Sequence, residues 1–258
     1  MTTLRDRVVL ITGASSGIGE ACARRFASEG ARVILWARRI ERLARLADDI
    51  EAQHGSQVHI AAVDVRDRSA VESAAAAALE AGDVPHVLVN NAGLARGFAK
   101  VYEGDPIDWD EMIDTNIKGL LWTTRAVLPA MVREGRGHVV NIGSTAGHMT
   151  YPSGNVYAAT KFAVNALTQG TSLDLLGTPV RVTSIDPGFV ETEFSIVRFR
   201  GDEGKADTVY RGFKPLTGAD VAEAVFWVCS LPPHVNVADL VMMPVAQRNI
   251  YVVDRGSG

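Results

Sequence analysis

The chain has 258 residues, 47% of them hydrophobic and 22% charged, and its formal net charge is −4 at pH 7. This length suits one large α/β domain, so we expect a single domain over residues 1–258. The slight negative charge gives no reason to expect binding to nucleic acid or to an anionic membrane. The apolar runs are too short for a membrane span or a signal peptide, and we predict a cytoplasmic protein.

The cysteines and histidines exclude two further kinds of site. Cys22 and Cys229 are the only cysteines and lie far apart, which is typical of a reducing compartment and offers no disulfide framework. The six histidines show none of the paired spacings of metal-ligating motifs. No metal site is therefore expected.

Short apolar runs alternate with amphipathic stretches along the chain. The expected strands cover residues 7–12, 32–37, 57–64, 86–91, 138–144, 180–186 and 240–244. Most of these runs are continuously apolar, the pattern of parallel strands that are buried on both faces. The sequence therefore predicts an α/β protein with a Rossmann-type, doubly wound sheet of about seven parallel strands and helices on both faces.

Three of the intervening stretches predict long helices. Apolar residues recur at helical spacing over 39–53, and residues 106–134 and 155–177 contain two more helices, the second ending near Gly177. Residues 187–217 have scattered aromatic and charged residues without a period. We expect this segment to be a substrate-binding lid.

The stretch TGASSGIG, residues 12–19, lies between the first strand and the first helix. Its glycines allow a sharp turn and let backbone N–H groups at the helix N-terminus approach a pyrophosphate. A tight turn without a ligand is the alternative, but strand, glycines and helix together favour a dinucleotide site. The expected coenzyme contacts in this loop are Gly13, Ser15, Ser16, Gly17, Ile18 and Gly19.

The end of the second strand indicates which dinucleotide binds. An acidic residue there would bind the ribose 2′-hydroxyl of NAD, whereas this sequence has Arg38 and Arg39 in LWARR. Two cations at the start of a helix oppose its dipole, so helix propensity does not explain them. Guanidinium groups bind phosphate in a forked geometry, and we predict NADP(H) as the coenzyme rather than two merely solvated arginines.

A possible acid–base pair lies at the carboxyl edge of the predicted sheet. Tyr157 and Lys161 are one helical turn apart, and NIGSTAG ends a strand with Ser144. Ser144 and Tyr157 are therefore predicted to hold a substrate oxygen, with Tyr157 exchanging its proton. We expect Lys161 and an oxidised nicotinamide ring to lower the pKa of the phenol from about 10. Tyr210 and Lys214 share the spacing but lack this setting, and they are expected to lie on the surface of the lid.

The glycine spacing, Ser144, Tyr157 and Lys161 together resemble the classical short-chain dehydrogenase/reductase family over essentially the full length. The resemblance implies that Asn116, in DTNIKG, completes a proton relay with Lys161 through water. It also implies a homotetramer, or alternatively a homodimer, that pairs the two long helices. Further coenzyme contacts implied by the resemblance are Asp64, Val65, Asn91, Ala92, Gly93, Pro187, Gly188, Val190 and Thr192.

Within that family, runs such as GNVYAATK and EFSIVRFRGDEGKA resemble the NADP-dependent 3-hydroxy acid dehydrogenases of the serine type. This resemblance implies hydride transfer from a small 3-hydroxy acid, such as serine or 3-hydroxypropionate, to the coenzyme, or from the coenzyme to the corresponding semialdehyde. A small carboxylate needs a cation, and Arg198 is the first candidate, with Arg200 and Arg96 as alternatives. The same arginines could instead form surface ion pairs with the acids Glu193, Asp202 and Glu203.

Three other functions use some of these residues. A broad-specificity carbonyl reductase for ketones or aldehydes would keep the same chemistry behind a different lid. A serine hydrolase using Ser144 and His148 would lack the G-x-S-x-G turn that exposes the nucleophile. A non-catalytic NADP-sensing protein would typically have lost Tyr157 or Lys161, and both are present.

Overall fold

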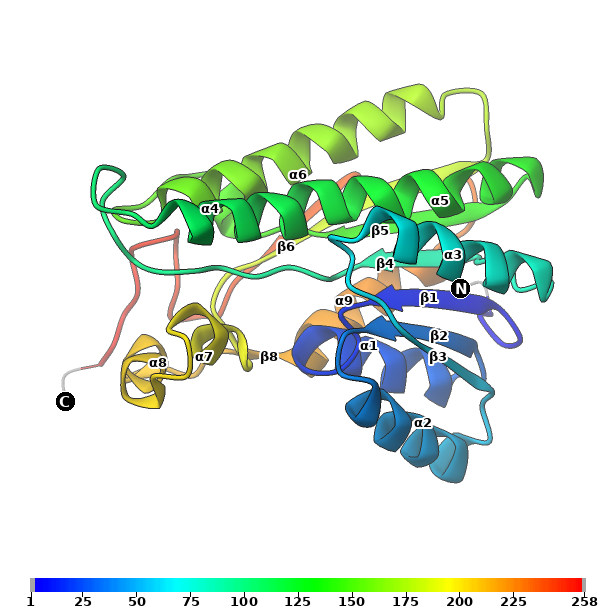
Figure 1. Ribbon diagram of the computed structural model, residues 1–258, viewed down its shortest axis with the longest axis horizontal. Coiled ribbons are helices and arrows are strands. Elements are labelled where there is room, and N and C mark those ends of the chain that lie inside the picture. The colour runs from blue at the N-terminus through cyan, green and yellow to red at the C-terminus, as the bar shows by residue number, and fades with distance from the viewer. Residues whose placement is uncertain (1–2, 257–258) are drawn as a thin grey trace.

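The computed structural model describes residues 3–256 and contains one seven-stranded sheet (Figure 1). Its strands are β1 (Val8–Thr12), β2 (Arg32–Ala37), β3 (Val58–Ala62), β4 (Val87–Asn90), β5 (Gly137–Ile142), β6 (Val180–Pro187) and β9 (Asp239–Met242). All neighbours pair in parallel, in the order β3-β2-β1-β4-β5-β6-β9. The strand order reverses between β1 and β4, so the predicted Rossmann-type sheet is confirmed.

Helices cover both faces of the sheet (Figure 1). One face carries α3 (Arg68–Glu80), α4 (Pro106–Ile113), α5 (Leu120–Arg133) and α6 (Asn155–Asp174). The other carries α1 (Gly17–Ser28), α2 (Ile40–His54) and α9 (Gly218–Ser230). None of the helices in the described part of the chain combines the length and apolar character needed to cross a bilayer.

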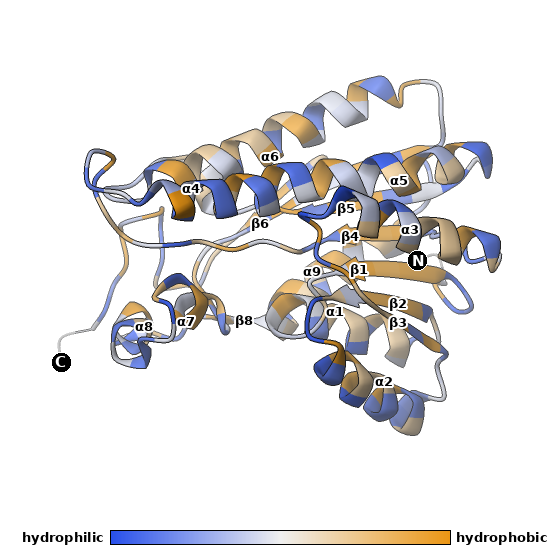
Figure 2. Cartoon of the chain, viewed as in Figure 1, coloured by the Kyte–Doolittle hydropathy of each residue, from blue (hydrophilic) through white to orange (hydrophobic). Residues whose placement is uncertain are grey.

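The strands are apolar because each central strand packs against helices on both sides. Every residue of β1 is buried, and Figure 2 shows the strands as mainly hydrophobic. One buried cluster includes Phe26 of α1 and Val225 of α9, and the other includes Val71 of α3 and Met131 of α5. Burial on both faces explains why the strand runs do not alternate between polar and apolar residues.

The helix predicted over 106–134 is not regular throughout. Residues Asp114–Gly119 form a π-helical turn between α4 and α5. Such turns occur often at functional sites because the extra residue redirects a side chain. Here the turn contains the buried Asn116, so the helix is interrupted at one of the predicted site residues.

The lid segment, residues 187–217, is built of short elements. These are β7 (Val190–Glu191), α7 (Phe194–Arg198), α8 (Glu203–Tyr210) and β8 (Leu216–Thr217), with β7 and β8 paired in parallel. Elements of two to eight residues are too short to give a clear hydrophobic period. In Figure 1, α7 and α8 lie beside the main sheet, near its carboxyl edge.

Candidate active site

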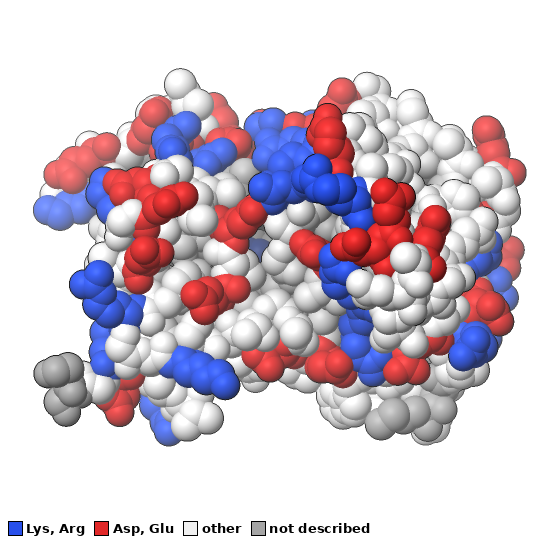
Figure 3. Space-filling model, turned by 90° about the horizontal axis from the view of Figure 1, so that it is seen from below, with Lys and Arg blue, Asp and Glu red and all other residues white. Residues whose placement is uncertain are grey.

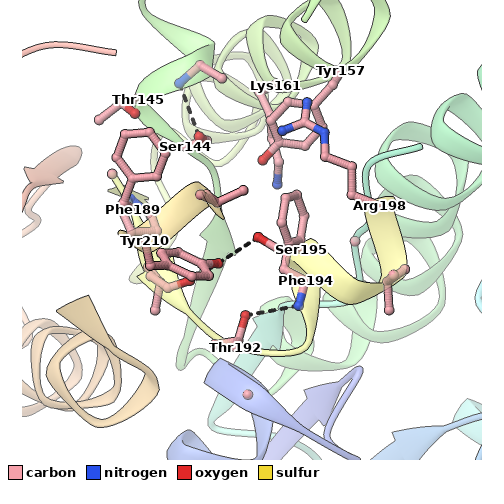
Figure 4. Close-up of a pocket in the computed structure, with 18 of the residues that line it drawn as sticks. Ser144, Thr145, Tyr157, Lys161, Phe189, Thr192, Phe194, Ser195, Arg198 and Tyr210 are labelled. Carbon is pink, nitrogen blue, oxygen red and sulfur yellow. Dashed lines mark hydrogen bonds between the residues drawn. The ribbon is translucent and has the colours of Figure 1, made fainter. Parts of the chain in front are cut away.

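A cavity of about 820 Å³ opens at the carboxyl edge of the sheet. Its walls come from the β1–α1 loop, the segments that follow β4, β5 and β6, the start of α6, and α7. Open parallel sheets bind ligands at this edge, where the strand order reverses. Figure 4 shows Tyr157 and Lys161 of α6 close to the lid residues Phe194 and Arg198 in this cavity.

The glycine loop leaves its backbone bare toward the cavity. Gly13 and Gly17 have positive φ values of 65° and 59°, which favour glycine. A Cβ atom on Gly13 would lie 2.9 Å from Cα of Ala92, and one on Gly19 would lie 2.5 Å from the Gly13 carbonyl oxygen. The loop therefore has no room for side chains at these positions, while its N–H groups open the N-terminus of α1 to an anion.

The segment after β4 is fixed against this loop. The Asn91 side-chain amide donates to the carbonyl oxygens of Thr12 and Gly13, at 2.9 and 3.2 Å. The Thr12 hydroxyl in turn accepts the backbone N–H groups of Asn91 and Ala92. These hydrogen bonds hold two sides of the cavity in a fixed relation.

Most of the predicted coenzyme contacts line the cavity. They are Gly13, Ser16, Gly17, Ile18, Asn91, Ala92, Gly93, Tyr157, Lys161, Pro187, Gly188, Val190 and Thr192. The other predicted contacts lie outside the cavity wall: Ser15, Gly19, Arg38, Arg39, Asp64 and Val65. Asp64 forms an ion pair with Arg66 at 2.6 Å, and Val65 is buried against Gly119.

Ser144, Tyr157 and Lys161 meet at one end of the cavity. The Ser144 hydroxyl accepts the Ala146 N–H at 3.0 Å, which orients it just after β5. Lys161 is buried one helical turn after Tyr157, with its Nζ 5.9 Å from the centre of the Tyr157 ring. Its ammonium donates to the Ile142 carbonyl oxygen at 2.8 Å. Both side chains of α6 therefore face the end of β5, as their spacing predicts.

The expected lowering of the Tyr157 pKa is not met in the chain without coenzyme. Burial raises the pKa of this phenol well above its ordinary value, although a hydrogen bond from Ser144 and the charge of Arg198 act to lower it. Burial also lowers the pKa of Lys161 to about 8, against the opposing effect of Asp186. Tyr157 is thus a neutral phenol at pH 7, and burial makes it hold its proton more firmly than a free tyrosine does.

Asn116 is held by backbone groups from the π-helical turn. Its side chain accepts the Leu94 N–H and donates to the Leu94 carbonyl oxygen, both at 2.8 Å. It also donates to the Thr160 hydroxyl at 3.0 Å. A Cβ atom on Gly93 would lie 3.3 Å from Asn116 Oδ1 and 3.7 Å from Lys161 Nζ. Asn116 and Lys161 therefore both lie beside Gly93.

The arginines after β2 differ in their surroundings. Arg38 is exposed, whereas Arg39 is half-buried and donates to the hydroxyls of Ser15 and Ser16 at 3.1 and 2.8 Å. These hydrogen bonds place the Arg39 guanidinium beside the glycine loop. Arg42, one turn further along, was not predicted from the sequence as a site residue. It shares a carboxylate with Arg39, because both pair with Glu193 of the lid.

The three candidate arginines for a substrate anion are not equivalent. Arg96 forms two hydrogen bonds to Glu111, at 2.6 and 3.1 Å, and Arg200 pairs with Asp108. Within residues 3–256, Arg198 has no carboxylate partner, and it lines the cavity. Arg198 is therefore the candidate whose charge faces the cavity uncompensated.

Aromatic rings surround the Arg198 guanidinium. Its Cζ lies 5.4 to 5.7 Å from the ring centres of Phe98, Tyr151 and Tyr157. It donates to the Tyr151 hydroxyl and to the Gly97 carbonyl oxygen. No hydrogen bond from its Nη1 is found in the described part of the chain, so N–H groups remain for a ligand. The rings hold the guanidinium without neutralising it.

Several residues of the cavity wall were not predicted from the sequence as site residues. Tyr210, expected on the lid surface, is half-buried and bonds to the Ser195 hydroxyl at 2.8 Å and the Val190 carbonyl oxygen at 2.9 Å. That expectation was wrong, because α8 turns Tyr210 inward toward β7. Phe189 and Tyr151 also line the cavity, and their only signal was their place in or near aromatic-rich loops.

A family model described as short chain dehydrogenase matches residues 7–202. The chain belongs to the short-chain dehydrogenase family. The resemblance predicted from the glycine loop, Ser144, Tyr157 and Lys161 is thereby confirmed.

This dehydrogenase has close relatives among characterised proteins. It is 50% identical over 241 residues to the NADP-dependent 3-hydroxy acid dehydrogenase YdfG of Escherichia coli (strain K12), covering 93% of this chain and 96% of that protein. It is 48% identical over 250 residues to sulfoacetaldehyde reductase 2 of Chromohalobacter salexigens, covering 96% and 98%. A solved closed form of serine dehydrogenase complexed with NADP+ matches with a TM-score of 0.90 and 50% identity, over 93% of this chain and 96% of that chain.

His148 of this dehydrogenase belongs to a carboxylate cluster rather than to a hydrolase dyad. Its Nε2 lies 2.5 Å from Asp186 and 3.7 Å from Asp239, and no hydrogen bond joins it to Ser144 within residues 3–256. A ring nitrogen of His148 and one carboxylate oxygen each of Asp186 and Asp239 lie within 4.8 Å of one another, a grouping that could hold a metal ion. Paired sequence spacings could not find this group, because its members follow β5, end β6 and begin β9.

We expect Asp239→Asn to stabilise the dehydrogenase at pH 8. Burial, and then the neighbouring Asp186, raise the pKa of Asp239 to about 6. Because this folded pKa exceeds the unfolded value of about 3.9, the protonated Asp239 carboxyl favours the folded state. Its contribution to the free energy of unfolding is complete below about pH 4 and is lost as the pH rises through 6, so at pH 8 the neutral Asn should be the more stable side chain. Because Asp239 is half-exposed, screening leaves about 1 kcal/mol, or a rise in Tm of about 2–4 °C for the variant.

Thermal unfolding at pH 8 and pH 5 measures this effect. Asp48→Asn makes the same charge change at an exposed site on α2 with no ion pair in the described residues, and its Tm should stay unchanged. Equal shifts for both variants, or an Asp239→Asn gain that is largest at pH 5, would contradict the assignment.

Proposed function

We propose that this chain is an NADP-dependent oxidoreductase acting on a small hydroxy acid or the corresponding semialdehyde. The observation that carries the proposal is the meeting of Ser144, Tyr157 and Lys161 with the uncompensated Arg198 in one cavity. The relatives support it, since their names specify NADP, 3-hydroxy acids and serine. The proposed catalytic residues are Asn116, Ser144, Tyr157 and Lys161.

The residues at the coenzyme end fit NADP. The glycine loop exposes its backbone N–H groups, which suits a pyrophosphate. The end of β2 has arginines and no acid, so it suits the 2′-phosphate of NADP rather than the free ribose hydroxyl of NAD. When bound, NADP(H) accepts or supplies the hydride. Pro187, Gly188, Val190 and Thr192 follow β6 and would form the wall beside it.

The proton chemistry belongs to the chain itself. In the reducing direction, the neutral Tyr157 phenol donates its proton to the substrate oxygen, which the Ser144 hydroxyl also binds. In the oxidising direction, the phenolate takes that proton back. Lys161 stabilises the phenolate by its charge. The family resemblance assigns to Asn116, which lies beside Gly93 as Lys161 does, the link from this ammonium to water.

The substrate class follows from Arg198. The Arg198 guanidinium has no carboxylate partner among residues 3–256 and lies 5.5 Å from the Tyr157 ring centre, which suits an anionic group one or two carbons from the reacting oxygen. Both a 3-hydroxy acid and sulfoacetaldehyde, the substrates in the relatives' names, carry such a group. A broad carbonyl reductase is the second candidate, favoured by the aromatic side chains Phe98, Phe189 and Tyr210 in the cavity wall.

A substrate panel tests the proposed function. We expect NADP+ reduction with 3-hydroxypropionate or serine, and NADPH oxidation with 3-oxopropanoate or sulfoacetaldehyde, to have at least about 10-fold higher kcat/KM than with neutral alcohols or aldehydes of equal length. Higher values for large neutral ketones would favour the carbonyl reductase. No change in nicotinamide absorbance with any substrate would favour a non-catalytic NADP sensor.

We also propose a cytoplasmic homotetramer. Exposed apolar side chains lie on α5 (Leu121), on α6 (Phe162 and Leu173) and on the edge strand β9 (Val241). The helix pair and the open edge of β9 therefore offer two faces for twofold contacts. The two buried free thiols suit a reducing compartment. Sedimentation analysis distinguishes four chains from two or one, and cell fractionation tests the location.

A further inference from the structure

A carboxylate of the lid lies between two arginines of the coenzyme end. Glu193 contacts Arg39 at 2.8 Å and Arg42 at 2.5 Å, each through a different carboxylate oxygen. These partners are 154 and 151 residues away in the sequence. Basic and acidic side chains gather at the upper centre of the face in Figure 3, so charges of both signs meet on this side of the molecule.

The position of this ion pair links it to the coenzyme site. Arg39 also donates to Ser15 and Ser16 of the glycine loop, which fixes its guanidinium beside that loop. Glu193 follows Thr192, whose side chain lies against Gly17. Glu193 itself lines the cavity, so its carboxylate lies where the end of β2, the glycine loop and the lid converge.

A carboxylate and a phosphate use the same features of an arginine. Both accept paired N–H donors in a forked geometry, and both gain from the same positive charge. Although partial burial acts to raise it, hydrogen bonds from Arg42 and Arg39 hold the pKa of Glu193 below its ordinary value. The group is therefore an anion at pH 7, and it is 36% exposed, so water can receive it when it leaves the arginines.

We propose that Glu193 competes with the 2′-phosphate of NADP for the pair Arg39 and Arg42, and that Arg42 contacts this phosphate together with Arg39. The inference rests on the proposed NADP dependence. Both anions cannot share the two guanidiniums without mutual repulsion, so the carboxylate competes with the phosphate. NAD, with a neutral 2′-hydroxyl, gains little from displacing Glu193. Glu193 thus lowers the affinity for NADP while Arg42 raises it.

Calorimetric titration of the full chain with NADP+ and NAD+ tests the proposal. We expect Glu193→Gln to lower the Kd for NADP+ about 3- to 5-fold, the size expected for losing a partly exposed competing charge, and to change the Kd for NAD+ less than about 2-fold. Arg42→Gln should raise the Kd for NADP+ by about 5-fold or more with little effect on NAD+. Glu191→Gln makes the same charge change two residues away, where the described residues include no arginine partner, and should leave both values unchanged.

The double variant makes the test specific. If Glu193 acts through the arginine pair, the gain from Glu193→Gln must shrink when Arg42→Gln is also present. An unchanged or higher Kd for NADP+ in Glu193→Gln overturns the competition, and an unchanged Kd in Arg42→Gln overturns the role of Arg42. A wild-type chain that binds NAD+ as tightly as NADP+ overturns the proposed function as well, so the two failures are distinguishable.

Discussion

Tyr157→Phe is expected to lower kcat by about 1000-fold while changing the Kd for NADP+ by less than about 3-fold, because a positioned acid–base group contributes about 100- to 10,000-fold. The variant keeps the ring, which packs against Phe194 at 5.6 Å between centres, and removes only the hydroxyl. That hydroxyl is neutral at pH 7, because burial raises its pKa. Steady-state kinetics with 3-oxopropanoate and coenzyme titration measure the two quantities.

Tyr210→Phe is the matched control for this prediction. It removes a second phenol of the same cavity, one that donates to the Val190 carbonyl oxygen and bonds to Ser195 rather than facing Lys161. We expect its kcat to fall by less than about 10-fold. Similar losses in both variants would mean that either hydroxyl acts through the shape of the cavity, and that Tyr157 is not the proton donor.

The sheet and the positions of Ser144, Tyr157 and Lys161 could be predicted because they depend on local patterns. The fully buried β1 appears in the sequence as an unbroken apolar run. The helical spacing that puts Tyr157 and Lys161 on one face is fixed by α6 alone. The glycine loop is equally local, since its strand, turn and helix are consecutive.

Features that arise from contacts distant in sequence could not be predicted. The π-helical turn within 106–134 contains Asn116, which bonds to a residue 22 positions earlier. Glu193 was expected to pair, if at all, with the lid arginines, but its partners are Arg39 and Arg42. The direction of the Tyr157 pKa depends on burial by several elements, which the spacing to Lys161 does not reveal.

The sequence placed Arg198 first among three arginine candidates for the substrate anion, but it gave no reason to exclude Arg96 or Arg200. All three are near aromatic and acidic residues, and composition does not tell which of them will be neutralised. The ion pairs Arg96–Glu111 and Arg200–Asp108 remove two of them, because their charges are compensated. Tertiary pairing thus supports the choice of Arg198 over the two alternatives.

Arg198→Leu is expected to raise KM for 3-oxopropanoate and sulfoacetaldehyde by about 10- to 150-fold, because a charge-assisted hydrogen bond contributes about 1.5–3 kcal/mol. For propanal, which has no anionic group, KM should change by less than about 3-fold. The charge of Arg198 also acts to lower the pKa of Tyr157, so its loss should reduce kcat modestly for all three substrates. The split between KM and kcat therefore separates anion binding from an effect on the phenol.

Arg200→Leu is the control, since it removes an arginine two residues away whose charge is already paired with Asp108. The KM values of Arg200→Leu should match those of the wild type for every substrate. Arg198→Lys keeps the charge but loses the forked geometry, so its KM values for the anionic substrates should lie between those of the wild type and those of Arg198→Leu. If Arg198→Leu raises KM for propanal as much as for the anions, the guanidinium only supports the aromatic wall of Phe98 and Tyr151. The preference for acids would then have to come from another cation of the cavity wall, such as Arg255.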